Sequence, residues 1–156
     1  HILHHNRTEE EANAMDLFRQ AVSAIKYDNA YPRGRSELDR FLHDAKAIGI
    51  KVNLSGDLPE QEELRHVMIL AMRECLTNSV RHAGATTIHI TAEKKGDSAS
   101  VKITNDGRAP ETEVVPKGGL HNLYRHIMDC GGTMEIQSKP GFALTVVLPA
   151  TEEGTK

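Results

Sequence analysis

Four side chains that can bind phosphate or a metal ion recur at helical spacing between residues 73 and 83. Glu74, Asn78 and Arg81 are four and three residues apart, and His82 follows Asn78 by four, so all four lie on one helical face. An amide oxygen suits Mg2+, a carboxylate one turn earlier can orient or deprotonate a nucleophile, and cations can face phosphate oxygens. Taken alone, however, the segment fits a solvated helix face with surface ion pairs better than a site.

Two glycine-containing motifs follow this helix and change that balance. Asn105-Asp106-Gly107 comes directly after a predicted strand, and Lys117-Gly118-Gly119-Leu120 opens the next predicted helix. Glycines before a helix N-terminus let backbone N–H groups approach an anion. Each motif alone also fits a plain turn, but their order and spacing after the Glu74–Asn78 face favour a phosphate and metal site.

The elements that must position these residues are predicted from hydrophobic periodicity and from turn residues. Predicted helices cover residues 8–26, 37–48, 60–83 and 119–130, and Pro59 is expected at the start of the third. Predicted strands cover residues 50–54, 87–92, 99–104, 133–137 and 143–148. Helices mixed with short hairpins favour an α+β fold, a two-layer α/β sandwich. A doubly wound parallel sheet is not expected, because the hairpins are too short for crossovers.

The first thirty residues are predicted to form a separate helical region. Met15, Phe18, Val22 and Ile25 form one apolar stripe, which could pack on the chain's own domain or join a helical bundle shared with a partner. We therefore expect a helical region and linker over residues 1–30, a main domain over residues 31–150, and a polar tail over residues 151–156. Because the chain begins at His1, we expect it to be a segment of a longer protein.

The composition of this chain of 156 residues limits the kinds of partner that we expect it to bind. The formal net charge is -3 with both signs interspersed, so a basic face for nucleic acid is not expected. No apolar run reaches the ~18 residues of a membrane span. Cys75 and Cys130 lie in apolar helical patterns and are expected to be buried free thiols, which fits a reducing cytoplasm.

The three motifs together resemble those of the ATPase superfamily (HATPase, or GHKL) shared by DNA gyrase, the large heat-shock chaperone, histidine kinases and the mismatch-repair MutL proteins. Residues 74–83 are similar to its N box, residues 105–107 to its G1 box and residues 117–120 to its G2 box. The sequences at 81–83, 131–136 and 144–149 are most similar to sensor histidine kinases paired with NarL-type response regulators, which carry helix-turn-helix output domains. The resemblance covers residues 36–150.

The resemblance implies a Bergerat-type sandwich, an N-terminal helix before it, and ATP held between the helix layer and a lid. Carried over by position, Asn78 holds Mg2+, Glu74 assists phosphoryl transfer, and Arg81 and His82 lie near the phosphates. Gly107 passes close to the adenine, and Gly118, Gly119 and Leu120 form the phosphate end of the lid. The carboxylate that reads adenine falls on Asn105, whose oxygen can still accept a hydrogen bond; with a one-residue shift, Asp106 takes that role.

The resemblance also implies a place in signalling. The γ-phosphoryl group of Mg-ATP would pass to a histidine upstream of this fragment, in the phosphoacceptor helical domain of the same protein. A response regulator would be the partner, and the full-length protein would be a cytoplasmic or membrane-anchored homodimer. The fragment itself is not expected to contact nucleic acid or membrane.

Several positions depart from the family pattern. Asn105, Ala109, Lys117 and Phe142 stand where the family has other residues. They leave open a nucleotide-binding or interaction module with weakened catalysis. A stand-alone ATPase or serine kinase of the same superfamily is the third alternative, and the apolar stripe of residues 15–25 argues against it.

Overall fold

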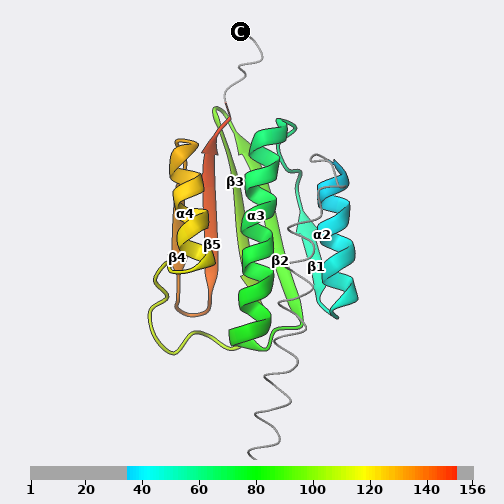
Figure 1. The fold of residues 1–156 in the computed structure, drawn as a ribbon, viewed down its shortest axis with the longest axis vertical. Coiled ribbons are helices and arrows are strands. Elements are labelled where there is room, and N and C mark those ends of the chain that lie inside the picture. The colour runs from blue at the N-terminus through cyan, green and yellow to red at the C-terminus, as the bar shows by residue number, and fades with distance from the viewer. Residues whose placement is uncertain (1–34, 151–156) are drawn as a thin grey trace, which may run out of the picture. The chain divides into compact units, whose positions relative to one another are not determined.

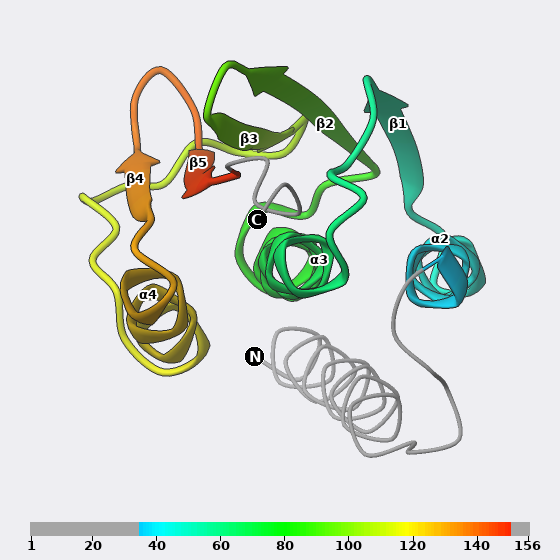
Figure 2. The same ribbon diagram turned by 90° about the horizontal axis from the view of Figure 1, so that it is seen from above.

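Five strands form one sheet and helices cover one of its faces in the computed structural model, which describes residues 35–150 (Figure 1, Figure 2). This arrangement confirms the predicted two-layer α+β sandwich. The predicted helix over residues 8–26, its linker and the tail from residue 151 lie outside the described residues. The elements are α2 (Arg35–Ala47), β1 (Lys51–Ser55), α3 (Glu62–Asn78), η1 (Ser79–Ala83), β2 (Thr87–Lys95), β3 (Ser98–Asn105), α4 (Gly119–Asp129), β4 (Thr133–Gln137) and β5 (Ala143–Pro149).

The strand order is β1-β2-β3-β5-β4. Strands β2, β3, β5 and β4 pair antiparallel, as the predicted hairpins require. Strand β1 pairs with β2 in parallel, and α3 and η1 supply the crossover that a parallel pair needs. The sheet is therefore mixed, which agrees with the exclusion of a doubly wound parallel fold.

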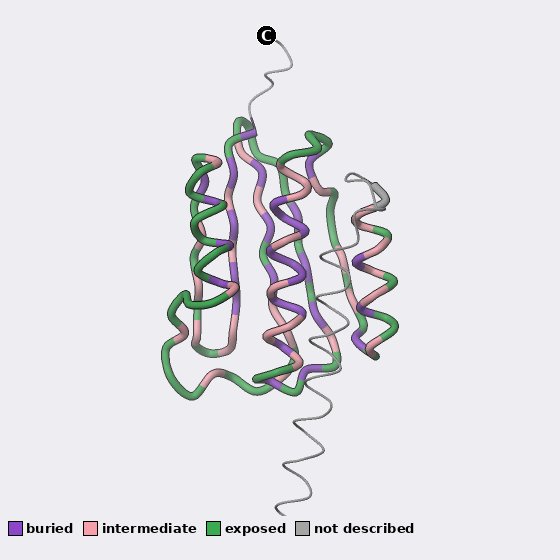
Figure 3. The backbone as a smooth tube through the Cα atoms, in the orientation of Figure 1, coloured by how far each residue is buried: buried purple, intermediate pink, exposed green. Residues whose placement is uncertain are grey.

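Alternation along the central strands places the core between the sheet and the helices. In β2, Ile88 and Ile90 are buried while His89 and Thr91 are exposed. Figure 3 shows the buried positions gathered on β2, β3 and β5 and on the inner side of α3. One apolar and one polar face is the usual pattern for a sheet covered on one side only.

The long helix differs from its prediction at both ends. It begins at Glu62 rather than Glu60, and Pro59 lies before it, because Gln61 has the extended ψ of 122° of an N-cap residue. The Nη1 atom of Arg65 donates hydrogen bonds to the carbonyls of Pro59 and Glu60, which precede the helix, each at 2.9 Å. The last predicted turn is a π-helix, η1, rather than α-helix.

The inner face of the long helix is apolar and mostly buried. Val67, Met68, Ala71 and Cys75 are buried, whereas Leu64 and Val80 are half-buried. Cys75 thus matches its prediction as a buried free thiol, while Cys130 is only half-buried. No helix among residues 35–150 is long and apolar enough to cross a membrane.

Arg73 fastens α3 to α2 from within the helix layer. Its side chain is 8% exposed and lies 3.3 Å from Asp44. The guanidinium carbon also stands 5.8 Å from the ring centroid of Phe41, which is fully buried. A buried cation with a carboxylate and an aromatic face as partners fixes the position of α2 against the helix that carries Glu74.

We predict that Arg73→Ala lowers the free energy of unfolding by about 2–3 kcal/mol, because it removes one partner of a buried ion pair. Arg125→Ala, at an exposed position of α4, is the matched control and should change stability by less than about 0.5 kcal/mol. Urea denaturation of both variants measures the difference, and equal effects would contradict the role given to Arg73.

Candidate functional site

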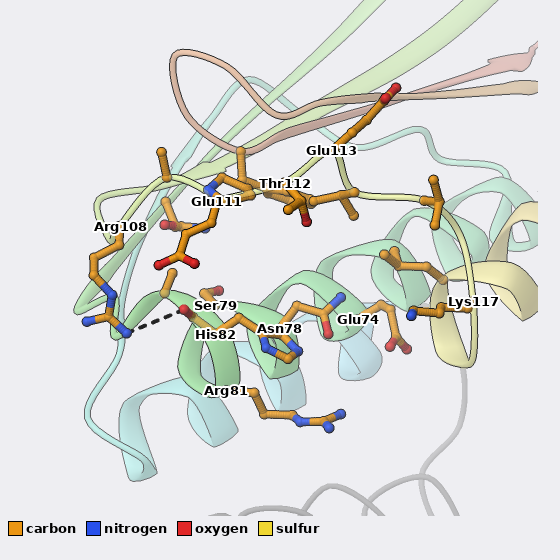
Figure 4. A pocket seen from close by; sticks show the side chains of 18 of the residues that line it. Glu74, Asn78, Ser79, Arg81, His82, Arg108, Glu111, Thr112, Glu113 and Lys117 are labelled. Carbon is orange, nitrogen blue, oxygen red and sulfur yellow. Dashed lines mark hydrogen bonds between the residues drawn. The ribbon is translucent and has the colours of Figure 1, made fainter.

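A cavity of about 800 Å³ lies between the outer face of α3 and η1, the loop that follows β3, and the start of α4 (Figure 4). Eight of the predicted site residues line it: the four of the helix face, Asn105, and three at the start of α4. They are Glu74, Asn78, Arg81, His82, Asn105, Gly118, Gly119 and Leu120. Asp106 and Gly107 do not line it. The structure thus brings the three separate sequence motifs together around one cavity.

The helix-face residues differ in how they meet the cavity. Glu74 and Asn78 are half-buried, whereas Arg81 and His82 are exposed. In Figure 4 the Arg81 side chain extends away from the loop that carries Arg108 and Glu111. Burial and then the charge of Arg81 lower the pKa of His82, which favours a neutral imidazole at the cavity wall.

A side-chain hydrogen bond accompanies the π-turn at η1. The Ser79 hydroxyl donates to the Cys75 carbonyl in the preceding turn, and such back-bonding competes with the regular helical pattern. Gly84 then ends the helix with a φ of 62°, a left-handed conformation that glycine adopts without cost. Single π-turns inside helices are frequent at functional sites, and this one directly follows Asn78.

Gly107 holds one end of the loop against η1. A Cβ at this position would overlap the carbonyl and side chain of Ala83. The next residue, Arg108, donates its backbone N–H to the Ala83 carbonyl at 2.9 Å. Gly107 itself donates to the Asn105 side-chain oxygen at 2.8 Å. The glycine is therefore explained by close backbone approach to the helix.

Asp106 is turned away from the cavity and braces the start of β2. Its carboxylate accepts from the backbone N–H groups of Thr86 at 2.9 Å and Thr87 at 3.0 Å, and from the Thr86 hydroxyl at 2.9 Å. These hydrogen bonds lower the pKa of Asp106 to about 2. Of the two residues considered for reading the base, only Asn105 lines the cavity.

The other end of the loop closes on Glu74. Gly118 has a φ of 59°, and Gly119 begins α4. A Cβ at Gly119 would overlap the Glu74 carboxylate, so this acid lies directly against the positive end of α4. In Figure 4 the amine of Lys117 extends toward the same carboxylate.

Several lining residues were not predicted as site residues. Arg108, Glu111, Thr112 and Val114 come from the loop between the glycine motifs. The loop is tied to the β4–β5 hairpin, because the Val114 N–H donates to the Ser138 hydroxyl at 2.9 Å. The sequence of these residues indicates only a loop. Their position between the two glycine motifs was the one signal that could have identified them as site residues.

The fold and the cavity together define a two-layer α+β sandwich with a site between its helix layer and a loop. Residues 63–152 match the family model described as histidine kinase-, DNA gyrase B-, and HSP90-like ATPase. The chain therefore belongs to this family, and the match spans all three motifs around the cavity.

Relatives in the family include sensor histidine kinases. The chain is 29% identical over 139 residues to the sensor histidine kinase LnrJ of Bacillus subtilis, covering 85% of this chain and 34% of LnrJ. It is 25% identical over 85 residues to the sensor histidine kinase YvfT of the same organism, covering 54% of this chain and 23% of YvfT. The chain thus spans about a quarter to a third of the length of these relatives.

Solved structures share the fold. The ATP binding domain of PrrB from Mycobacterium tuberculosis superposes with a TM-score of 0.57 at 26% identity, covering 74% of this chain and 93% of that one. The histidine kinase domain of the Erythrobacter litoralis EL346 blue-light activated histidine kinase has a TM-score of 0.62 at 20% identity, covering 94% and 76%. The latter supports the fold alone.

We predict that Gly119→Ala destabilises the wild-type chain by no more than about 1 kcal/mol, because the new methyl group displaces only the flexible end of the Glu74 side chain from the start of α4. In a Glu74→Ala background the same substitution should be neutral or stabilising, since the overlap is gone and alanine favours the helix. Chemical denaturation of the two single variants and the double variant gives the coupling energy. Independent, additive effects would show that the two residues are not in contact.

Asp106→Ala should destabilise the chain in a pH-dependent way. The folded-state pKa of Asp106 lies near 2, below the ordinary value of 3.8, so its stabilisation is fully present well above that ordinary value and is lost as pH falls toward about 2. The stability difference between wild type and variant should be constant from about pH 7 to about pH 5 and shrink below that. Urea denaturation across this range tests it; a difference unchanged at the acid end would refute the assigned hydrogen bonds.

Proposed function

We propose that this chain is the catalytic ATP-binding part of a sensor histidine kinase, and that its cavity holds Mg-ATP. The observation that carries the proposal is the meeting of the Glu74–Asn78 helix face with the glycine-bounded start of α4 in one cavity. A helix N-terminus preceded by glycines attracts phosphate, and the facing amide and carboxylate suit a hydrated divalent cation.

Two side chains on the helix wall of the cavity offer oxygen atoms that suit Mg2+. Asn78 and Glu74 lie one helical turn apart on the same wall, and both carry oxygen ligands. Among residues 35–150 no group of three histidine, cysteine or acidic side chains is arranged to hold a metal ion. A cation here would complete its shell with water and phosphate oxygens, as Mg2+ usually does. Bound Mg2+ would neutralise phosphate charge during transfer.

The chain's own residues would act mainly by positioning. The first N–H groups of α4 and the Lys117 amine would face the phosphates, and Asn78 would orient the metal-bound end of the nucleotide. Glu74 would turn from the α4 N-terminus toward the acceptor, because incoming phosphate competes for the same positive helix end. His82, held toward its neutral form, and Arg81 would lie at the outer edge of the helix, nearer to Ala83 than to the phosphates at the start of α4.

We further propose that the γ-phosphoryl group passes to a histidine on a separate helical segment of the same protein, in a homodimer in the cytoplasm. A response regulator, here of the NarL type, would then receive it. The relatives named as sensor histidine kinases support this assignment, and the endings at residues 81–83, 131–136 and 144–149 support the NarL-type pairing. The helical region over residues 1–30 would link the ATP-binding domain to the acceptor.

One contact favours the alternative of a binding module with weak catalysis. Glu74 lies against the α4 N-terminus, where its carboxylate competes with phosphate for the same backbone groups. If this competition dominates, nucleotide affinity rises when the acid is removed, as in Glu74→Gln. If Glu74 instead assists transfer, the same variant binds nucleotide unchanged and loses phosphohistidine formation with an added acceptor segment.

The central test is calorimetric titration with Mg-ATP and a nonhydrolysable analogue. Asn78→Ala should weaken Mg-ATP binding by about tenfold, the loss of one bond to a charged group, of about 1.4 kcal/mol. In EDTA the variant and wild type should bind the nucleotide alike, since the lost group serves the cation. Asn122→Ala, at an exposed position of α4 outside the cavity, is the control. No binding to the wild-type chain at millimolar nucleotide would refute the proposal.

A further inference from the structure

The cavity has two chemically different ends, separated along the helix wall. The start of α4 lies at Glu74, and the turn at Gly107 lies at Ala83. Glu74 and Ala83 are nine positions apart in the sequence, which corresponds to roughly 13 Å at the helical rise of about 1.5 Å per residue. With phosphates at the α4 N-terminus, as proposed above, the base of a nucleotide falls at the Ala83 end. The polar lining residues of the loop side at that end are Asn105, Arg108 and Glu111.

Asn105 is the base-end residue that the fold holds in place. It is the last residue of β3, and its side-chain oxygen accepts the Gly107 N–H at 2.8 Å. This bond sets the orientation of the amide, because a backbone N–H requires the oxygen and not the NH2 group opposite it. The NH2 group of Asn105 has no hydrogen-bond partner within residues 35–150, so an unused donor remains at the cavity wall.

An amide and a carboxylate at this position present different chemistry to a base. A carboxylate only accepts hydrogen bonds, so it pairs with the amino group at C6 of adenine and repels a carbonyl oxygen there. The Asn105 amide offers two N–H donors, and its oxygen keeps a second lone pair. It can therefore meet either an oxygen or an amino group at C6.

The neighbouring side chains strengthen the case for a base carbonyl. Arg108 adds a cation, held near η1 by a 3.5 Å contact from Nη2 to the His82 carbonyl. Glu111 supplies an acceptor, and Figure 4 shows it on the loop at the same end as Arg108. Two donors and one acceptor complement the C6 carbonyl and the N1–H group of a 6-oxopurine.

Asp106 does not restore selection for adenine. Both of its carboxylate oxygens are engaged by Thr86, and one also accepts from Thr87. Releasing the carboxylate toward the cavity would break these hydrogen bonds at the start of β2. The base end therefore keeps an amide as its only strand-anchored polar side chain among the described lining residues.

We infer that Asn105 makes this site accept 6-oxopurine nucleoside triphosphates, the chemistry shared by inosine and guanosine triphosphates, in addition to ATP. The inference rests on the proposed nucleotide site and specifies its substrate class. Adenine remains a ligand through the second lone pair of the Asn105 oxygen, so discrimination between the two kinds of base is weak.

The test is calorimetric titration of the whole chain with the Mg2+ complexes of ATP, ITP and GTP. In the wild type, the dissociation constants of ATP and ITP should agree within about tenfold. Asn105→Asp keeps an acceptor for the Gly107 N–H but removes the donor, so it should raise the ratio of the ITP to the ATP constant by at least about tenfold. Asn122→Asp makes the same chemical change outside the cavity and should leave the ratio unchanged.

The outcomes separate this inference from the function on which it rests. If ATP binds and ITP binds more than about a hundredfold more weakly, or if Asn105→Asp leaves the ratio unchanged, the inference is overturned while the nucleotide site stands. If ITP binds and GTP does not, the C6 contact is supported and the 2-amino group is excluded by shape. If no nucleotide binds at millimolar concentration, the proposed function fails and the inference fails with it.

Discussion

The site depends on two places where the loop after β3 meets the long helix at close range. Gly107 lies against Ala83 at one end, and Gly119 lies against the Glu74 carboxylate at the other. The first contact is an approach of backbone to backbone that a Cβ would block, whereas the second sets the start of α4 against a side chain of the helix. The cavity exists because the loop is anchored to the helix twice, with polar residues spanning the distance between the anchors.

These anchors explain how a generic charged helix face becomes a site. Glu74 and Asn78 alone would face solvent, where isolated charges contribute little. With the α4 N-terminus beside it, the Glu74 carboxylate neutralises a positive helix end. The same backbone groups attract phosphate, so the chain's own acid and the phosphates of the proposed nucleotide would compete for one position. In the proposed function, binding and catalysis at this end would therefore both depend on the movement of a single side chain.

Much of the fold could be predicted because its patterns are local. Period-two alternation located β2 and β3, and the 3.6-residue period located α2, α3 and α4 to within a few residues. The π-turn at η1, where the Ser79 hydroxyl bonds to the Cys75 carbonyl, could not be predicted, because the hydrophobic periodicity of the sequence does not record a single wider helical turn. The parallel pairing of β1 was also missed, since it is set by the α3 crossover rather than by a hairpin turn.

The two ends of the cavity also differ in how far the sequence predicts them. At the α4 end, backbone geometry provides the binding groups, so two glycines and a helix start were enough to place it from sequence. At the base end, side-chain orientation decides the chemistry. Asn105 and Asp106 are adjacent and similar in shape, yet one lines the cavity and the other is bound to Thr86 and Thr87. The sequence left both open, because Asp106 is held by Thr86 and Thr87, which precede it by twenty and nineteen residues. In the proposed function, the base end, rather than the phosphate end, is thus where this chain's specificity would be determined.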